Sequence, residues 1–161
     1  KLNKNKLIDV KKIIKIENKK LAEIIKSSGY HNQKAKKLKN FCNFLLKSYD
    51  GKLSSLFKNK INELRIELLS VDGIGPETAD SILLYAFKRP GVVIDTYTKR
   101  IFYRIGLCTV DVKYDELQQL FIENMDKDYK IFNEYHALLV EHAKRCCTAK
   151  TVGNDCLLRR K

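Results

Sequence analysis

Residues 69–80 read Leu-Ser-Val-Asp-Gly-Ile-Gly-Pro-Glu-Thr-Ala-Asp, and this stretch predicts a helix, a tight turn and a second helix. Gly73 and Gly75 accept backbone angles that other residues avoid, and they let the main chain approach a ligand closely. Ile74 between them can fill the space between the two helices. Pro76 suits the first position of the second helix, where its missing N–H is not needed. We therefore expect a helical hairpin centred on the Gly-Ile-Gly sequence.

The start of the second helix is a predicted anion site. Free backbone N–H groups at a helix start favour an anion, and one DNA phosphate would fit there. An apolar run, Val92-Val93-Ile94, then leads to Asp95, about twenty residues after Gly75. Gly-Ile-Gly alone would be a weak signal, but the following Pro-x-Thr-Ala and the spaced aspartate make it much more specific.

These segments resemble the helix-hairpin-helix, Gly/Pro-rich loop and aspartate signature of the endonuclease III superfamily of DNA glycosylases. The hairpin is residues 71–79, the Gly/Pro-rich loop is residues 88–93, and the aspartate is Asp95, at the start of a helix over 95–106. Residues 25–38 read Ile-Lys-Ser-Ser-Gly-Tyr-His-Asn-Gln-Lys-Ala-Lys-Lys-Leu. They resemble the segment before the hairpin in 3-methyladenine DNA glycosylase III and its endonuclease III-related relatives.

The resemblance runs from about residue 7 to about residue 150. It implies a single HhH-GPD glycosylase domain over residues 1–161, with the helix-hairpin-helix at 61–88 and a degenerate iron–sulfur-like loop at 146–161. In that family, helices before the matched region carry a Gln-rich wedge that fills the gap left by a flipped base. No match to the wedge is found, so either the chain is a fragment or its N-terminal part was lost.

Helical periodicity predicts an all-α fold, a bundle of short helices with no alternating strand pattern and no repeat. Asn18 is the expected cap of a second short helix that ends at Gly29. Apolar faces include Ala86 in the second hairpin helix, and Leu138 and His142 in the last helix. The expected helices cover residues 7–14, 18–29, 31–49, 53–57, 61–71, 76–87, 95–106, 114–125 and 129–145.

The composition favours a polyanionic partner. The chain has 161 residues, 44% of them hydrophobic, a formal net charge of +13 and a pI of about 9.5. Nucleic acid is the first candidate and an anionic membrane surface the second; scattered lysines disfavour the membrane. The resemblance implies that the nucleic acid is double-stranded DNA with a damaged base. A genome rich in Lys, Asn and Ile would also raise the charge. No apolar run suits a membrane span or a secretory signal.

The cysteine count points to a reducing compartment. There are five cysteines, and an odd number without a signal argues against a disulfide framework. We therefore expect an intracellular protein, in the cytoplasm or nucleoid, or in the nucleus or an organelle if the source is eukaryotic. Nothing in the sequence suggests more than a monomer.

Asp95 is the predicted catalytic residue. Breaking an N-glycosidic bond builds positive charge on the deoxyribose, and a carboxylate beside the sugar stabilises that charge and orients or deprotonates water. The apolar approach gives Asp95 a dry setting, and the helix start keeps it ionised. The alternative is that Asp95 is only the N-cap of its helix. The hairpin and the spacing favour the catalytic role, and both roles are compatible.

Glu77 indicates which class of glycosylase to expect. The resemblance implies that bifunctional members carry a lysine at this place in the hairpin, where it forms a Schiff base with the sugar. Glu77 cannot form an imine, and the nearest lysines, Lys88 and Lys99, fall at positions that the family does not use in this way. The resemblance therefore implies a monofunctional enzyme that leaves an abasic site. As a structural alternative, Glu77 is a first-turn acid that complements the helix dipole.

The resemblance implies base flipping and an alkylated purine substrate, with 3-methyladenine first. Tyr30 and His31 are the predicted pocket residues. Tyr85, Tyr97 and Tyr103 are candidates only because a cationic base stacks well on an aromatic ring. Phosphate contacts are expected from the hairpin and from nearby basic residues, namely Gly73, Ile74, Gly75, Glu77, Thr78, Lys34 and Lys99, with Arg100 next.

The C-terminal cysteines resemble an incomplete metal site. Many endonuclease III relatives hold a [4Fe–4S] cluster with a Cys-x6-Cys-x2-Cys-x5-Cys loop, which needs four thiolates. Cys146 and Cys156 match the first and third positions, Gly153 stands at the second, and the fourth would follow Lys161. Cys147 could substitute with altered geometry. The alternatives are a degenerate or lost cluster, free thiols, or zinc bound by the three cysteines and His142.

A second class of function remains open at this stage. Helix-hairpin-helix elements also grip duplex DNA in proteins without chemistry, so the chain could be a non-catalytic binding module or an inactive glycosylase fragment. Asp95 favours the enzyme, because a carboxylate near phosphates would only weaken a pure DNA binder. Glu77 disfavours an abasic-site lyase.

Overall fold

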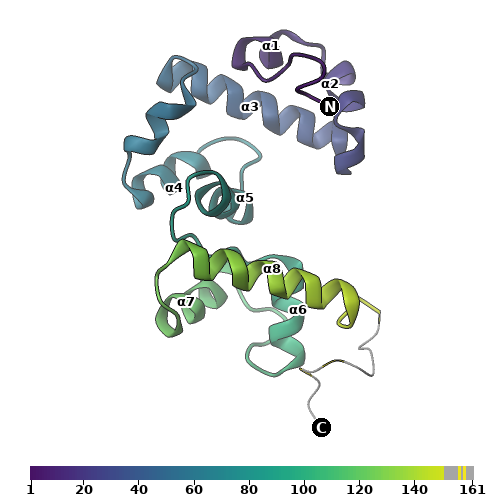
Figure 1. Ribbon diagram of the computed structural model, residues 1–161, viewed down its shortest axis with the longest axis vertical. Coiled ribbons are helices and arrows are strands. Elements are labelled where there is room, and N and C mark those ends of the chain that lie inside the picture. The colour runs from purple at the N-terminus through teal and green to yellow at the C-terminus, as the bar shows by residue number, and fades with distance from the viewer. Residues whose placement is uncertain (151–155, 157, 159–161) are drawn as a thin grey trace. The chain divides into compact units, whose positions relative to one another are not determined.

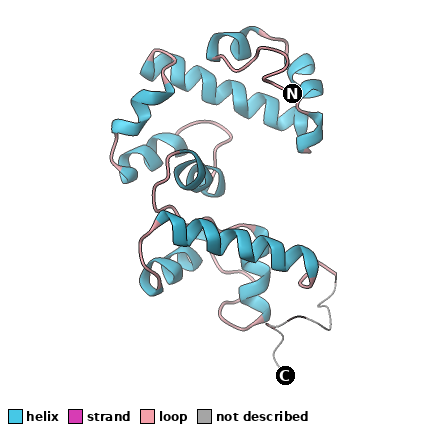
Figure 2. Ribbon diagram, viewed as in Figure 1, coloured by secondary structure: helices cyan, strands magenta, loops and turns pink. Residues whose placement is uncertain are grey.

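The computed structural model describes residues 1–150, 156 and 158, and every regular element in this part of the chain is helical (Figures 1 and 2). The all-α prediction is confirmed. The chain divides into two compact units, residues 1–75 and 76–161. None of the described helices is both long enough and apolar enough to cross a membrane.

In the first unit, short helices pack on one long helix. α1 (Val10–Lys15) and α2 (Asn18–Ile24) both lie against α3 (His31–Tyr49), and their shared core includes Leu21, Ala35 and Cys42. The remaining elements are the 3₁₀ turns Lys26–Ser28 and Leu53–Lys58 and the helix α4 (Ile61–Leu69). The observed bounds of α3 are those predicted from its apolar periodicity of 3.6 residues.

The expected cap of α2 is wrong. Asn18 is the first helical residue, and Glu17 occupies the cap position without a side-chain hydrogen bond. By contrast, Asp9 caps α1, accepting a hydrogen bond of 2.8 Å from the backbone N–H of Lys12. Gly29 follows the 3₁₀ turn with φ +66°, so it ends the segment as expected.

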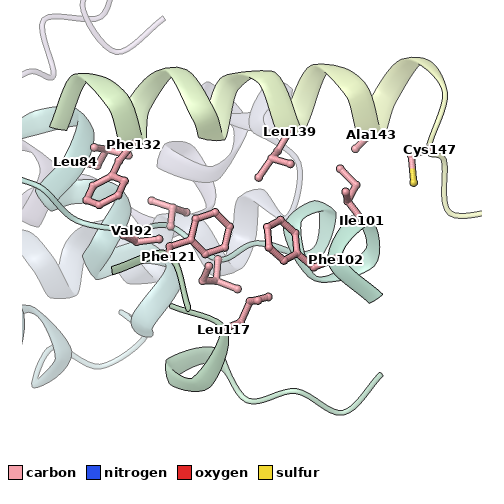
Figure 3. Packing of buried hydrophobic residues seen from close by; sticks show 12 residues of the cluster. Leu84, Val92, Ile101, Phe102, Leu117, Phe121, Phe132, Leu139, Ala143 and Cys147 are labelled. Atoms are coloured by element: carbon pink, nitrogen blue, oxygen red, sulfur yellow. The ribbon is translucent and has the colours of Figure 1, made fainter. Parts of the chain in front are cut away.

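The second unit holds α5 (Pro76–Ser81), the π-helical turn Ile82–Ala86, α6 (Thr96–Arg104), α7 (Tyr114–Asn124) and α8 (Tyr129–Arg145). Both α6 and the π turn pack against α8. The core joins Phe102, Phe121, Phe132 and Leu139, and the rings of Phe102 and Phe121 lie 4.9 Å apart (Figure 3). Burial of these apolar side chains stabilises this unit.

Two predicted inward residues face solvent instead. In the π turn the N–H of Phe87 donates to the carbonyl of Ile82, five residues back. This turn is wider than an α-helical turn, so the side chains that follow are rotated about the helix axis, and Phe87 is buried where Ala86 was expected to be. On α8 the inward face is formed by Phe132, Leu139 and Ala143, which leaves Leu138 58% exposed.

The turn between α4 and α5 shows why one of its glycines is required. Gly73 has φ +88°, in the left-handed region, and the N–H of Ile74 donates to the carbonyl of Val71 at 2.9 Å. A Cβ atom on Gly73 would lie 2.7 Å from Cγ of Lys37, whereas one on Gly75 would meet open space. The backbone therefore demands glycine at 73 and accepts a side chain at 75.

We expect Gly73→Ala to lower the free energy of unfolding by about 1–3 kcal/mol, because alanine is strained at this φ. Urea unfolding measures the change. Gly75→Ala is the matched control and should alter stability by less than about 0.5 kcal/mol. Equal losses in the two variants would contradict this account of the turn.

Candidate active site

Asp95 stands where an apolar segment meets a helix. Val92, Val93 and Ile94 are buried, and they bring the chain through the core of the second unit to the start of α6. Oδ1 of Asp95 accepts two hydrogen bonds from Thr98, 2.7 Å from the backbone N–H and 2.9 Å from the hydroxyl. The N-cap role is therefore real, and it uses one carboxylate oxygen only.

The second oxygen faces a histidine that sequence reasoning did not single out. Oδ2 of Asp95 lies 3.4 Å from Nε2 of His136 on α8, and the two side chains are only 13% and 14% exposed. Nδ1 of His136 is hydrogen-bonded to the hydroxyl of Tyr85 on the π turn. The π turn, the start of α6 and the middle of α8 thus bring Tyr85, Asp95 and His136 together in a row.

The surroundings keep Asp95 ionised. Burial alone would raise the pKa of this carboxyl, but the close contact with His136 and the hydrogen bonds from Thr98 outweigh it, and the net pKa lies below the usual aspartate value. Burial raises the pKa of Tyr85, and the charge of Asp95 raises it further. At neutral pH the site therefore holds a negative carboxylate beside a protonated phenol.

Thr98 provides a test of this pKa. Thr98→Val keeps the shape of the buried side chain and the backbone bond but removes the hydroxyl bond, so the pKa of Asp95 should rise. Because a base must be ionised to act, the acid limb of base release should move to higher pH in the variant, while the rate near pH 7 changes less. Rates measured from about pH 3 to pH 7 show the shift, and identical profiles would contradict the assignment.

A buried polar network fixes the segment that carries Asp95. Asp80, on α5, is 1% exposed and accepts hydrogen bonds from the hydroxyl of Tyr114 (2.9 Å) and the amide of Gln118 (2.8 Å) on α7. The same amide donates to the carbonyl of Val92 at 2.7 Å, and the N–H of Ile94 donates to the hydroxyl of Tyr114 at 3.3 Å. The network thus bonds the main chain just before the catalytic candidate.

The predicted phosphate contacts differ in their surroundings. Glu77 and Thr78 are exposed in the first turn of α5, and Ile74 is buried. Lys34 donates to the carbonyl of Ser28. Lys99 donates to the carbonyl of Val112 at 2.8 Å, so its ammonium already has a protein partner. These phosphate contacts remain predictions.

Tyr30 and His31, the predicted pocket residues, belong to the first unit. Tyr30 is 82% exposed with φ +46°, directly before α3, and His31 is the first residue of that helix. Their role in a substrate pocket remains a prediction. Tyr85, considered only for its aromatic ring, is brought to the site at Asp95 through its hydroxyl.

Comparison with known proteins decides the family. The profile of the HhH-GPD superfamily of base excision DNA repair proteins matches residues 1–127. The chain belongs to this superfamily. The matched region includes the turn at Gly73, residues 88–93 and Asp95.

Relatives with curated names support this assignment. A protein of Methanocaldococcus jannaschii, provisionally named as a DNA repair glycosylase, is 44% identical over 155 residues, 95% of this chain and 70% of that protein. Endonuclease III of Rickettsia prowazekii is 30% identical over 152 residues, 92% of this chain and 65% of that enzyme. The chain thus spans about two thirds of the length of these relatives.

Solved structures agree on the fold. A non-covalent endonuclease III–DNA complex matches with a TM-score of 0.75 at 23% identity, over 94% of this chain and 66% of that one. The 3-methyladenine DNA glycosylase of H. pylori, bound to 1,N6-ethenoadenine, matches with a TM-score of 0.70 at 30% identity, over 84% of this chain and 67% of that one. The predicted helix-hairpin-helix glycosylase fold is confirmed.

The described residues do not fit the iron–sulfur cluster found in many members of this superfamily. A [4Fe–4S] cluster needs four thiolates, whereas the group gathered at the end of α8 consists of His142, Cys146 and Cys156. The thiol of Cys147 lies instead 3.1 Å from Nη1 of Arg104. The expected gap at Gly153 and the position after Lys161 fall outside the described residues.

Proposed function

We propose that this chain is a monofunctional DNA glycosylase, which hydrolyses the bond between a damaged base and its deoxyribose and leaves an abasic site. The observation that carries the proposal is the shielded, ionised carboxylate of Asp95. Duplex DNA with a damaged base is the proposed substrate, and the chain acts as a monomer.

In the proposed reaction the damaged nucleotide first leaves the base stack. The bond from C1′ to the base nitrogen then breaks, its electron pair departs with the base, and positive charge develops on the sugar. Asp95 stabilises that charge through Oδ2, because Oδ1 is already committed to Thr98. Water adds to C1′ and passes a proton to the carboxylate, which acts as the general base.

His136 and Tyr85 are positioning residues in this proposal. Contact with Nε2 of His136 directs Oδ2, and the Tyr85 hydroxyl in turn fixes the imidazole through Nδ1. A carboxylate held on both oxygens needs little reorganisation as charge develops, and such preorganisation is a major source of electrostatic catalysis.

An alkylated purine is the proposed base. A cationic base such as 3-methyladenine is already a good leaving group, so a carboxylate without a strong acid suffices. The H. pylori relative is named as a 3-methyladenine DNA glycosylase, and it is 30% identical to this chain. Chromatography of the bases released from alkylated duplex DNA tests the proposed substrate, and we expect 3-methyladenine. Release of oxidised pyrimidines alone from damaged DNA would contradict the proposal.

The monofunctional mechanism rests on Glu77, which offers no amine at the start of α5. Glu77→Lys places a primary amine there, and borohydride should then trap at least about tenfold more covalent protein–DNA complex than with the unaltered chain, through a reduced Schiff base. Gel electrophoresis measures the trapped fraction.

Glu77→Arg is the matched control, because it supplies the same charge without an amine that forms an imine. It should bind DNA as well as Glu77→Lys and trap nothing. Strong trapping by the unaltered chain would contradict the monofunctional mechanism. No gain in Glu77→Lys would contradict the correspondence between Glu77 and the family's lysine.

A further inference from the structure

A second group of reactive side chains lies outside the site built on Asp95. His142 stands in the last turn of α8, and Cys146 follows four residues later, where the helix ends. Residues four apart share one face of a helix. Cys156 completes the group, and one ligand atom from each residue lies within 4.8 Å of the others.

The distances suit a single tetrahedral ion. Nε2 of His142 lies 3.8 Å from Sγ of Cys146 and 3.3 Å from Sγ of Cys156. An ion with Zn–N of about 2.05 Å and Zn–S of about 2.3 Å would hold nitrogen and sulfur about 3.6 Å apart. The two observed distances bracket that value.

The chemistry of the donors selects the metal. Two thiolates with one imidazole are typical of zinc, whereas the group contains no carboxylate, the side-chain ligand that Mg²⁺ and Ca²⁺ prefer. Cys146 is half-buried and Cys156 is buried, so both are shielded from bulk solvent.

We propose that His142, Cys146 and Cys156 bind one Zn²⁺ ion, in place of the iron–sulfur cluster that the superfamily leads one to expect. These residues supply three ligands of a tetrahedral site.

Neighbouring contacts indicate what the ion would stabilise. Nε of Arg100 donates to the carbonyl of Cys147 at 2.9 Å, and Nη1 of Arg104 donates to the carbonyl of Thr148 at 2.7 Å. The segment after α8 is thereby bonded to α6, the helix that Asp95 caps. Zinc would hold this segment in place, so zinc binding and folding of the second unit should be coupled.

The test is the metal content of the whole chain purified under reducing conditions. We expect about one zinc per chain, no inorganic sulfide, and an intense cobalt spectrum of tetrahedral type after exchange with Co²⁺. Loss of a residue that only orients a metal ligand costs about 10–100-fold in metal affinity, so loss of a ligand itself in His142→Ala should cost more than about 100-fold in zinc affinity.

Two further variants keep the outcome clear. His142→Cys should retain zinc through three thiolates, and His31→Ala, on α3, should bind zinc like the unaltered chain. Iron with sulfide, no bound metal, or unchanged zinc affinity in His142→Ala would each overturn the proposal. If His142→Ala fails to fold, the cobalt spectra of the unaltered chain and of His142→Cys decide whether His142 is a ligand. If it is, the two spectra differ in their thiolate charge-transfer bands, and identical spectra would overturn the proposal.

Discussion

The Asp95→Asn variant should release damaged bases about 10²–10³-fold more slowly than the unaltered chain. The substitution removes the negative charge that stabilises the developing sugar cation, and the amide oxygen is too weak a base to accept a proton from water. Single-turnover rates with the protein in excess over alkylated duplex measure the effect without interference from product release.

The same variant should remain folded and should bind DNA at least as tightly. Asparagine caps helices about as well as aspartate, so the contact from the N–H of Thr98 is preserved. Removing a negative charge near phosphates favours DNA binding. A loss of base release accompanied by an equal loss of binding or of helical structure would therefore contradict a catalytic role for Asp95.

The second large effect is expected at Asp80. Asp80→Ala removes the buried acceptor of Tyr114 and Gln118, and leaving such donors unsatisfied should lower the free energy of unfolding by about 3 kcal/mol. Because both donors also bond the chain at Val92 and Ile94, Asp95 should move, and a misplacement of about 1 Å costs about 10²-fold in rate. Urea unfolding and single-turnover rates measure the two losses.

Asp126→Ala is the matched control for Asp80→Ala, since Asp126 is exposed in the loop before α8. Its stability should change by less than about 0.5 kcal/mol. Asp80→Asn keeps an acceptor for both donors and should recover part of the lost rate. Full activity in Asp80→Ala would show that the network does not position Asp95.

The long amphipathic helices could be predicted from the sequence. The bounds of α3 and α8 agree with their apolar periodicity, and the extended apolar entry to Asp95 is buried as expected. The π turn after α5 could not be predicted, because periodicity assumes one register, and a single wide turn moved Ala86 to the surface. Periodicity also could not tell which of the neighbours Leu138 and Leu139 is buried, because this depends on the face of α8 that meets the core; Leu139 is the buried one.

The candidate site was only partly accessible from sequence. Asp95 followed from its spacing to the glycine turn, but His136 lies on α8, far along the chain, and nothing local distinguishes it from other helical histidines. Asp80 carried a usable signal, since it is a charged residue directly after the inward-facing Ala79 and four positions before the buried Leu84. A carboxylate at such a position is buried only when donors meet it.

The most direct test of the central claim is release of free base from alkylated duplex DNA by the unaltered chain, with strand nicking and DNA binding scored in the same reaction. We predict release of an alkylated purine well above the uncatalysed rate, with an intact strand that carries an abasic site. Tight DNA binding without base release would contradict catalysis by Asp95 and would identify the chain as a DNA-binding module.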